Sequence, residues 1–142
     1  FAINSILVPD PRQINKIIKG IYDSLKEKGW FLGIFPSMES IIYYSTLVHE
    51  GELAKSGNMK KALSMARRKA ERRKYSFIEG TYSDNGEKQK FFYSWELSKR
   101  LGDAGFKDIK IRKVKYPWSM SGDFERFDGR KRMWDWLVVA RK

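Results

Sequence analysis

Two polar side chains, Asn4 and Ser5, interrupt the apolar run FAINSILV with which the chain opens. This run, residues 1–8, is typical of a buried strand. Open α/β sheets bind ligands beyond the carboxyl ends of their strands, which makes Asn4 and Ser5 candidates for a binding site. The alternative is that they mark the end of the strand and satisfy its backbone groups. The sequence favours neither interpretation over the other.

The other side chain that often takes part in chemistry is the single histidine, His49, within a predicted helix over residues 38–53. A lone histidine on a helix is more often packed or solvated than catalytic. The chain has no cysteine, which excludes thiolate metal sites and a cysteine nucleophile, and one histidine cannot supply the usual zinc ligands. No GxSxG, GxGxxG or P-loop motif occurs. The sequence therefore predicts no metal site and identifies no catalytic residue.

The composition is that of a folded domain with a strongly basic surface. Of the 142 residues, 42% are hydrophobic, which is enough for a core. The net charge is +12. Such a surface attracts nucleic acid, an anionic membrane or an acidic ligand, but lysine-rich soluble proteins have it too. No apolar run approaches the roughly 18 residues of a membrane span. The lack of cysteine suits a reducing compartment, so we expect a cytoplasmic protein.

The first elements predicted from the pattern are a strand, a helix and a second strand. Asp10 followed by Pro11 is typical of a helix start, and apolar residues then recur at helical spacing as far as Leu25. We expect Gly29 to end this helix in the left-handed conformation. The next segment, Trp30–Phe35, is apolar almost throughout, which indicates a strand covered on both faces. Such a unit is typical of α/β proteins.

Further helices and strands follow along the chain. Ser56-Gly57-Asn58 separates two predicted helices, and Asp84-Asn85-Gly86 is a hairpin-turn signal. The expected elements are helices over residues 38–53, 59–73 and 95–104, hairpin strands over 75–82 and 87–93, and sheet strands over 107–115 and 134–140. The last strand is strongly apolar, which predicts a buried position in the sheet.

The helix around residues 58–74 carries a basic face. Its apolar stripe is narrow, and the opposite side holds Lys60, Lys61, Arg67, Arg68, Lys69, Arg72, Arg73 and Lys74. Such a face can bind phosphates, and that binding weakens steeply with salt. More often it is simply solvated, and no aromatic side chain among the cations offers a base-stacking surface. Nucleic acid is therefore one candidate partner.

Four phrases stand in a characteristic order along the chain: NSILVPDP at residues 4–11, LKEKGWFLGIFPS at 25–37, SWELSKRLGDAGF at 94–106 and WDWLVVARK at 134–142. Together they resemble the second half of the class I S-adenosylmethionine-dependent methyltransferases. The first two resemble the end of that family's fourth strand and the turn into its fifth. The last two resemble the helix before the sixth strand and the seventh strand itself. The turn before residue 30 departs from the family's pattern, because one glycine stands where two are common.

The resemblance implies an α/β fold that is part of a Rossmann-like methyltransferase sheet, with strands 4-5-7-6 of the full order 3-2-1-4-5-7-6 and the seventh strand antiparallel. Residues 1–142 would form a single partial domain, the C-terminal half of the fold. Residues 37–93 would be an inserted lid of helices and a hairpin on the acceptor side. The chain opens without methionine inside an expected strand, which also leads us to expect further sequence upstream.

The resemblance also implies site residues by position. Asn4, Ser5 and Ile6 stand where strand-four residues approach the methionine end of the cofactor, S-adenosylmethionine, although most cofactor contacts are expected from the upstream half. The family's acceptor pocket draws on the segment after the fifth strand, and weaker candidates lie near the end of the sixth. The substrate-binding residues implied in this way are Ser37, Met38, Ile41, Tyr44, His49 and Trp118, with Tyr116 close by in the sequence.

The leading hypothesis is methyl transfer to a small-molecule acceptor by a full-length parent protein, to which this chain contributes the acceptor-side half. The Asn/Asp-Pro-Pro-aromatic motif of amino-methylating nucleic-acid enzymes is absent, because Ser5-Ile6-Leu7-Val8 stands in its place. The alternatives are an RNA or protein methyltransferase that docks through helix 58–74, and a non-enzymatic interaction domain. We expect the upstream half or a second copy to cover strand 1–8, because an uncovered apolar edge invites aggregation. The fragment alone would then be inactive.

Overall fold

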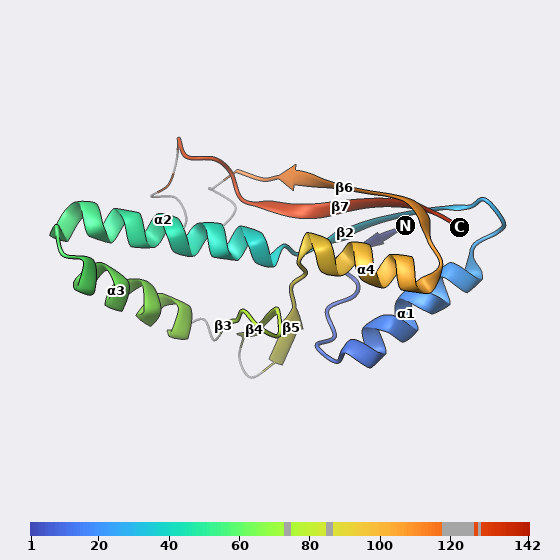
Figure 1. Cartoon of the computed structure of the whole chain (residues 1–142), viewed down its shortest axis with the longest axis horizontal. Helices are drawn as coiled ribbons and strands as arrows, with labels where there is room; N and C mark the ends of the chain where they lie inside the picture. The colour runs from blue at the N-terminus through green and yellow to red at the C-terminus, as the bar shows by residue number, and fades with distance from the viewer. Residues whose placement is uncertain (73–74, 85–86, 118–126, 128) are drawn as a thin grey trace.

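The computed structural model describes residues 1–72, 75–84, 87–117, 127 and 129–142. The elements in chain order are β1 (Ala2–Ile3), α1 (Pro11–Ser24), β2 (Trp30–Phe35), α2 (Met38–Ser56), α3 (Met59–Arg72), β3 (Tyr75–Ser76), β4 (Thr81–Asp84), β5 (Glu87–Lys90), α4 (Ser94–Ala104), β6 (Lys107–Lys115) and β7 (Trp134–Arg141). Helices α1 and α4 pack on one face of a four-stranded sheet (Figure 1). Helices α2 and α3 extend beyond the end of the sheet as an arm (Figure 1).

The sheet confirms the expected fold class. Its strand order is β1-β2-β7-β6. Strand β1 is parallel to β2, and β7 is antiparallel to both of its neighbours, β2 and β6. This is the arrangement 4-5-7-6 of a Rossmann-like methyltransferase sheet, in which the last strand of the chain lies inside the sheet.

The opening strand is shorter than the pattern predicts. A strand is expected over residues 1–8, whereas β1 comprises only Ala2–Ile3. The strand ends because Asn4 adopts a left-handed conformation, with φ of 45°. Further on, the Leu7 carbonyl accepts a hydrogen bond from the backbone amide of Lys90 at 2.7 Å. The chain after Asn4 therefore packs against β5 as an irregular segment.

Helix α1 ends at Ser24, earlier than the expected stop at Gly29, and its end has a different cause. The pattern predicts a left-handed stop at Gly29, but the residue with positive φ is Lys28, at 60°. Glycine is needed at position 29 for another reason, because a Cβ there would lie 2.7 Å from the Lys26 carbonyl oxygen. The ammonium group of Lys142 donates to the Leu25 carbonyl at 2.8 Å and so satisfies one acceptor at the end of the helix.

Strand β2 is deeply buried on one face only, which corrects the expectation of two covered faces. Phe31 and Phe35 point toward α1 and α4 and are 3% and 2% exposed. The alternate residues point the other way, and Trp30 is 56% exposed. Helices α1 and α4 both lie on the first side (Figure 1).

The second side of the sheet is apolar across three strands. Ile3 pairs with Ile34, and Leu32 pairs with Val139, so their side chains share this side. Ile3 is 52% exposed. We call this surface the open face. It comprises Phe1, Ile3, Trp30, Leu32, Ile34, Leu137 and Val139.

Residues 37–93, expected as an insertion, connect β2 to α4. Helices α2 and α3 pack against each other, and the three-stranded sheet β3-β4-β5 follows them. The first expected hairpin strand is divided, because a turn with Gly80 at φ 62° separates β3 from β4. The expected turn residues 85–86 lie outside the described residues. Helix α2 packs one side into a second core cluster with Phe127 and Met133.

The start of α4 joins the insertion to the α/β core. Ser94 is the first residue of the helix and not its cap, and the capping residue Tyr93 makes no capping bond with its side chain. Instead, the Glu39 carboxylate on α2 accepts hydrogen bonds from the backbone amide of Ser94 at 2.8 Å and from its hydroxyl at 2.7 Å. A side chain of the insertion thus takes the place of a local cap.

Gly105 ends α4 as expected, and its replacement is expected to destabilise the protein. Its φ is 107°, and a Cβ there would lie 3.0 Å from the ring of Tyr22 on α1. Gly105→Ala should lower the free energy of unfolding by more than about 1 kcal/mol, measured by urea denaturation. The matched control is Gly102→Ala, where a Cβ meets nothing within 4 Å and should stabilise the helix by up to about 1 kcal/mol. Equal stability of the two variants would contradict this account.

Candidate functional site at the carboxyl ends of the strands

The predicted cofactor residues follow directly on β1, where the parallel strands β1 and β2 end. The backbone amide of Asn4 donates to the Ile34 carbonyl at 2.9 Å, and the Ser5 hydroxyl donates to the Ile3 carbonyl at 2.9 Å. Asn4 and Ser5 are exposed, whereas Ile6 is 2% exposed and belongs to the core. The structure therefore presents Asn4 and Ser5 at the surface and uses Ile6 for packing beneath them.

A carboxylate that the sequence analysis missed, Asp135 on β7, lies at the same end of the sheet. Its neighbours Trp134 and Trp136 are buried on the helix side, so Asp135 points toward the open face. Burial raises the pKa of Asp135, and hydrogen bonding from the backbone amide of Ser37 and the side chain of Asn4 lowers it to a smaller extent. Asp135 thus brings together residues that follow β1 and β2.

Tyr116, a weaker sequence candidate, extends this group of polar side chains. Burial raises the pKa of Tyr116 to about 12, the Asp135 carboxylate acts in the same direction, and hydrogen bonding with Ser40 lowers it. The Ser40 hydroxyl also accepts from the Trp134 backbone amide at 3.0 Å. Tyr116 is therefore a neutral phenol at neutral pH. We call the set Asn4, Ser37, Ser40, Tyr116 and Asp135 the strand-end cluster.

The strand-end cluster combines a partly buried carboxylate with a neutral phenol. The carboxylate of Asp135 accepts hydrogen bonds, and the hydroxyl of Tyr116 can donate one. Such a pair can hold a hydroxyl or amine of a ligand, and a carboxylate whose pKa is raised is a better proton acceptor than an ordinary one. One sequence signal pointed to Asp135, because it is the only charged residue in the apolar run WDWLVVA.

The other predicted substrate residues lie at the start of α2. Met38, Ile41 and Tyr44 are 0%, 5% and 4% exposed and pack in the second core cluster. Ser37 caps the helix, and its hydroxyl accepts from the Ser40 amide at 3.0 Å. The structure therefore places one predicted residue, Ser37, in the strand-end cluster, and the three larger side chains in the core behind it.

Of the last two predicted substrate residues, His49 is not in the strand-end cluster. His49 lies twelve residues beyond Ser37 on the same helix run, which is about 18 Å along the axis. It lines a shallow hollow between α2 and α3, together with Ile42, Leu63 and others. Its Nε2 atom is buried without a hydrogen-bond partner among the described residues. Trp118 lies outside the described residues.

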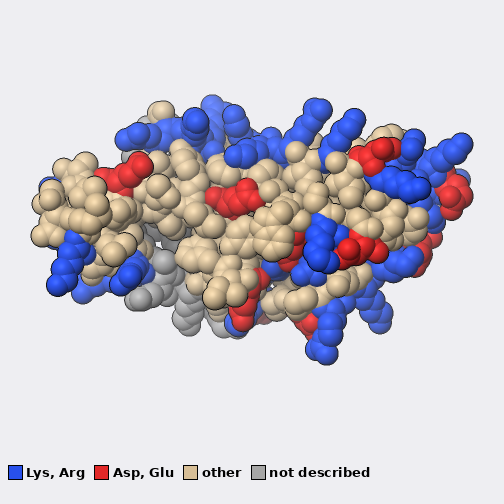
Figure 2. Space-filling view, in the orientation of Figure 1, with Lys and Arg blue, Asp and Glu red and all other residues tan. Residues whose placement is uncertain are grey.

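Basic side chains are numerous on β6 and on α3. Figure 2 shows Lys and Arg side chains along the edge that β6 forms and around α3. The cations of β6 are Lys107, Lys110, Arg112, Lys113 and Lys115. Lysine is common on edge strands, where it discourages pairing with other chains. On α3, Lys60, Lys61, Arg67 and Arg68 are exposed. Nucleic-acid docking through this helix stays a prediction.

None of the helices in the described part of the chain is long and apolar enough to cross a membrane. Among the same residues, no group of three acidic or histidine side chains could hold a metal ion.

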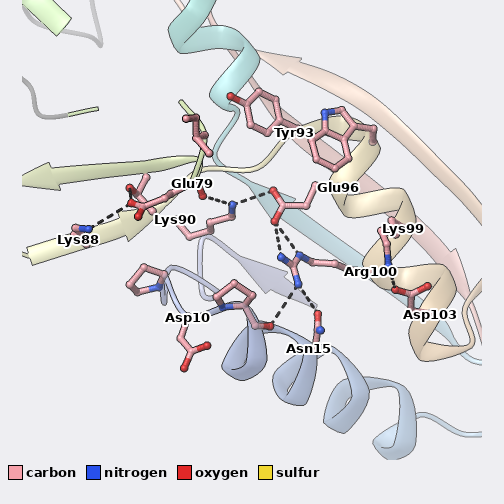
Figure 3. Close-up of a pocket in the computed structure, with 15 residues that line it drawn as sticks. Asp10, Asn15, Glu79, Lys88, Lys90, Tyr93, Glu96, Lys99, Arg100 and Asp103 are labelled. Carbon is pink, nitrogen blue, oxygen red and sulfur yellow. Dashed lines mark hydrogen bonds and ion pairs between the residues drawn. The ribbon is translucent and has the colours of Figure 1, made fainter. Parts of the chain in front are cut away.

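A cleft of about 640 Å³ opens between the β4–β5 hairpin, the start of α1 and one side of α4 (Figure 3). No residue of the strand-end cluster lines it. Glu96 on α4 lies in the cleft at 6% exposure and forms ion pairs with Lys90 at 3.0 Å and Arg100 at 2.8 Å. In the sequence these three residues look like ordinary surface charges, and no motif distinguishes them.

Comparison with known proteins bears on the fold. The sequence matches no protein-family model. It also matches no curated protein. A crystal structure of a SAM-dependent methyltransferase from Methanosarcina mazei is similar to the chain, with a TM-score of 0.54 at 14% sequence identity. The similarity covers 100% of this chain and 57% of that one, so the chain spans little more than half the length of the protein it matches. At this identity the likeness shows the methyltransferase fold.

Replacing Asp135 is expected to change how stability depends on pH. Because burial raises the pKa of Asp135 in the folded protein, the folded state holds the proton more tightly than the unfolded state. The stability from this carboxyl is thus present at low pH and is lost as pH rises through its folded pKa. Asp135→Asn should therefore be at least as stable as the wild type at about pH 7, and its advantage should vanish in acid, measured by urea denaturation across pH.

A second variant tests the same carboxylate: Asn4→Ala keeps Asp135 and removes a hydrogen bond to it. That hydrogen bond lowers the pKa of Asp135. Asn4→Ala should therefore steepen the loss of stability with rising pH. If Asp135→Asn is less stable than the wild type by the same margin at every pH, Asp135 acts in folding through its hydrogen bonds and not through its charge.

Proposed function

We propose that this chain is the acceptor-side half of an S-adenosylmethionine-dependent methyltransferase and that the full-length protein methylates a small molecule. The observation that carries the proposal is the strand order β1-β2-β7-β6 with β7 antiparallel to its neighbours. A reversed last strand between the fifth and sixth strands is the order that the family resemblance implies. The likeness to the Methanosarcina mazei methyltransferase extends over the whole of this chain and supports the same proposal.

The residues after β1 fit the cofactor in part. Bound S-adenosylmethionine supplies an electrophilic methyl group. Asn4 and Ser5 are exposed at the carboxyl end of β1 and offer amide and hydroxyl groups suited to the polar methionine part of the cofactor. Ile6 is buried, so its part would be to fix the backbone beneath them. Further contacts would come from the upstream half.

The strand-end cluster would hold the acceptor. Tyr116, as a neutral phenol, would donate a hydrogen bond to it, and Asp135 would accept one from its hydroxyl or amine. Asp135 could then receive the proton that the acceptor loses on methylation. Holding acceptor and methyl group in line contributes much of the rate in such a reaction, and the insertion 37–93 would help by closing over the site. A small polar cluster of this kind suits a small-molecule acceptor.

The upstream half would complete the sheet. Strand β1 is an edge strand, and the open face beside it leaves Phe1 85% and Ile3 52% exposed. An apolar surface of this kind is unfavourable in water and prone to pair with other chains. A cofactor-binding half that paired with β1 would cover the unpaired edge of that strand. If it also packed on the open face, it would remove the exposed apolar side chains from water.

The proposed function is tested by cofactor binding to the full natural gene product that contains these residues. S-adenosylhomocysteine should bind with a micromolar Kd in isothermal titration calorimetry. Asn4→Ala should weaken binding by about tenfold, the loss of one hydrogen bond of roughly 1.4 kcal/mol. Ser64→Ala on the exposed side of α3 is the control and should bind as the wild type does. A full-length protein that gives no heat of binding would leave the non-enzymatic interaction domain as the better proposal.

The 142-residue chain by itself is expected to self-associate through its open face. Light scattering should give a mass above that of one chain at micromolar concentration, because hydrophobic association removes the exposed side chains from water. Ile3→Lys should shift the protein toward monomer. The control is Leu63→Lys, which changes an apolar residue of similar exposure on α3, 43% against 52% for Ile3. A monomeric wild type would refute the proposed role of the open face.

A further inference from the structure

The cleft between the β4–β5 hairpin and α4 has apolar walls and a charged floor (Figure 3). Pro9 and Pro11, on either side of Asp10, line it where the chain enters α1, and Tyr93 and Trp95 line it at the start of α4. Figure 3 shows Asp10 and Tyr93 on opposite sides of the ion pairs of Glu96. A cleft of about 640 Å³ with apolar walls and a few polar groups is of the kind that holds small organic ligands.

The floor of the cleft is a network of three charged side chains, of which Lys90 and Glu96 are buried and Arg100 is partly exposed. Glu96 is held by Arg100, whose Nη2 and Nε lie 2.8 and 2.9 Å from Oε1, and by Lys90, whose Nζ lies 3.0 Å from Oε2. Lys90 also donates to the Glu79 carbonyl at 2.7 Å, and Arg100 donates to the side-chain oxygen of Asn15. Lys90 and Glu96 are 4% and 6% exposed, so these charges lie largely out of water.

This floor carries one positive charge in excess. Lys90 and Arg100 face a single carboxylate, Glu96. The acidic residues at the rim do not supply the missing negative charge, because each has a basic partner of its own. The pairs are Asp10 with Arg12 at 3.2 Å, Glu79 with Lys88 at 3.4 Å, and Asp103 with Lys99. An uncompensated buried charge is costly, and a bound anion would relieve that cost.

Lys90 can accommodate such an anion. An ammonium group has three N–H donors; Lys90 donates one hydrogen bond, to the Glu79 carbonyl, and forms an ion pair with Glu96 Oε2 at 3.0 Å. The Phe92 ring centroid lies 5.4 Å from the same Nζ atom. A single hydrogen bond to the described residues leaves this ammonium group donor capacity for a ligand oxygen, and the guanidinium of Arg100 on the other side of Glu96 adds to the attraction. One excess charge matches a singly charged carboxylate better than a doubly charged phosphate.

The wall opposite the prolines is a flat aromatic surface. The rings of Tyr93 and Trp95 stack, with centroids 5.5 Å apart and planes inclined by 17°. The hydroxyl of Tyr93 donates to the Phe77 carbonyl at 2.6 Å, which holds this ring in place. Trp95 is 64% exposed although it is large and apolar. An exposed indole that stacks on a second aromatic ring beside a cleft is well suited to pack against a planar ring.

We propose that this cleft binds a planar aromatic carboxylate, with its ring against Trp95 and its carboxylate directed toward Lys90 and Arg100. Such binding goes beyond the proposed methyl transfer and does not require it, because the cleft and the strand-end cluster share no residue. A ligand of this class would be held by an apolar contact and a charge interaction at once, and neither a neutral aromatic molecule nor a non-planar acid would satisfy both.

The ligand class is tested with the full natural gene product in the absence of S-adenosylmethionine. The probe is 4-hydroxybenzoate, followed by saturation-transfer NMR and isothermal titration calorimetry. The comparison ligands are 4-hydroxybenzamide, which keeps the ring and lacks the charge, and cyclohexanecarboxylate, which keeps the charge and lacks the flat ring. The Kd of 4-hydroxybenzoate should be at least about tenfold lower than that of either, a difference of roughly 1.4 kcal/mol. Equal affinities for the acid and the amide would overturn the proposal.

Two substitutions locate the binding in this cleft. Lys90→Met removes the excess charge, keeps the alkyl packing and leaves Glu96 paired with Arg100. It should abolish the preference for the acid over the amide. Trp95→Ala changes an exposed side chain, should fold normally by circular dichroism and should weaken both aromatic ligands by about fivefold to tenfold.

The control for Trp95→Ala is Met59→Ala, which removes an apolar side chain of similar exposure from α3, 59% against 64% for Trp95. It should bind as the wild type does. Should Lys90→Met fail to fold, Trp95→Ala and the ligand series still decide the outcome, and unchanged affinity in Trp95→Ala would overturn the proposal. No cofactor is present in this titration, so its failure is distinguishable from a failure of the proposed methyl transfer.

Discussion

Strand β7 sits between β2 and β6, and the rest of the structure depends on its register. Trp136 pairs with Phe35 on one side and with Lys113 on the other. Side chains alternate along a strand, so Trp136 and Val138 point into the core while Asp135 points to the open face. A slip of one residue would bury the charge of Asp135 under the helices and expose the tryptophan, which is why this register is strongly determined. The position of Asp135 beside Ser37 and Asn4 follows from it.

The same strand connects the sheet to the insertion through Phe92. The indole of Trp136 donates to the Phe92 carbonyl at 3.1 Å, and the Met38 amide donates to that carbonyl at 3.0 Å. The Phe92 amide in turn donates to the Pro36 carbonyl at 2.7 Å, and its ring is fully buried. Lys90 of the cleft lies two residues before Phe92, and Ser37 of the strand-end cluster lies next to Met38. One buried junction thus positions residues of both sites.

The sequence predicted well those features that depend on local periodicity. Strand β2, helix α4 and its stop at Gly105 were confirmed, because hydrophobic spacing and glycine conformation are properties of neighbouring residues. The prediction at Gly29 was wrong because its requirement for glycine comes from the close approach of a carbonyl and not from φ. The predicted length of the opening strand was wrong, because the strand ends where one residue, Asn4, adopts a left-handed conformation. The sequence pattern of β2 indicates a strand, but it does not determine whether one face or both faces of that strand are covered.

The charged sites could not be predicted for a different reason. Lys90 and Glu96 are six residues apart and on different elements, and Asp135 meets Ser37 and Asn4, which lie 98 and 131 positions earlier in the chain. Their chemistry depends on burial, which tertiary packing decides. Both groups of charges lie where the insertion meets the α/β core. A protein with apolar side chains of similar volume in such positions is often at least as stable as one with a buried ion pair. Stability alone therefore does not explain the carboxylate of Glu96 between two cations, and its place in a cleft with an exposed indole favours a role in binding.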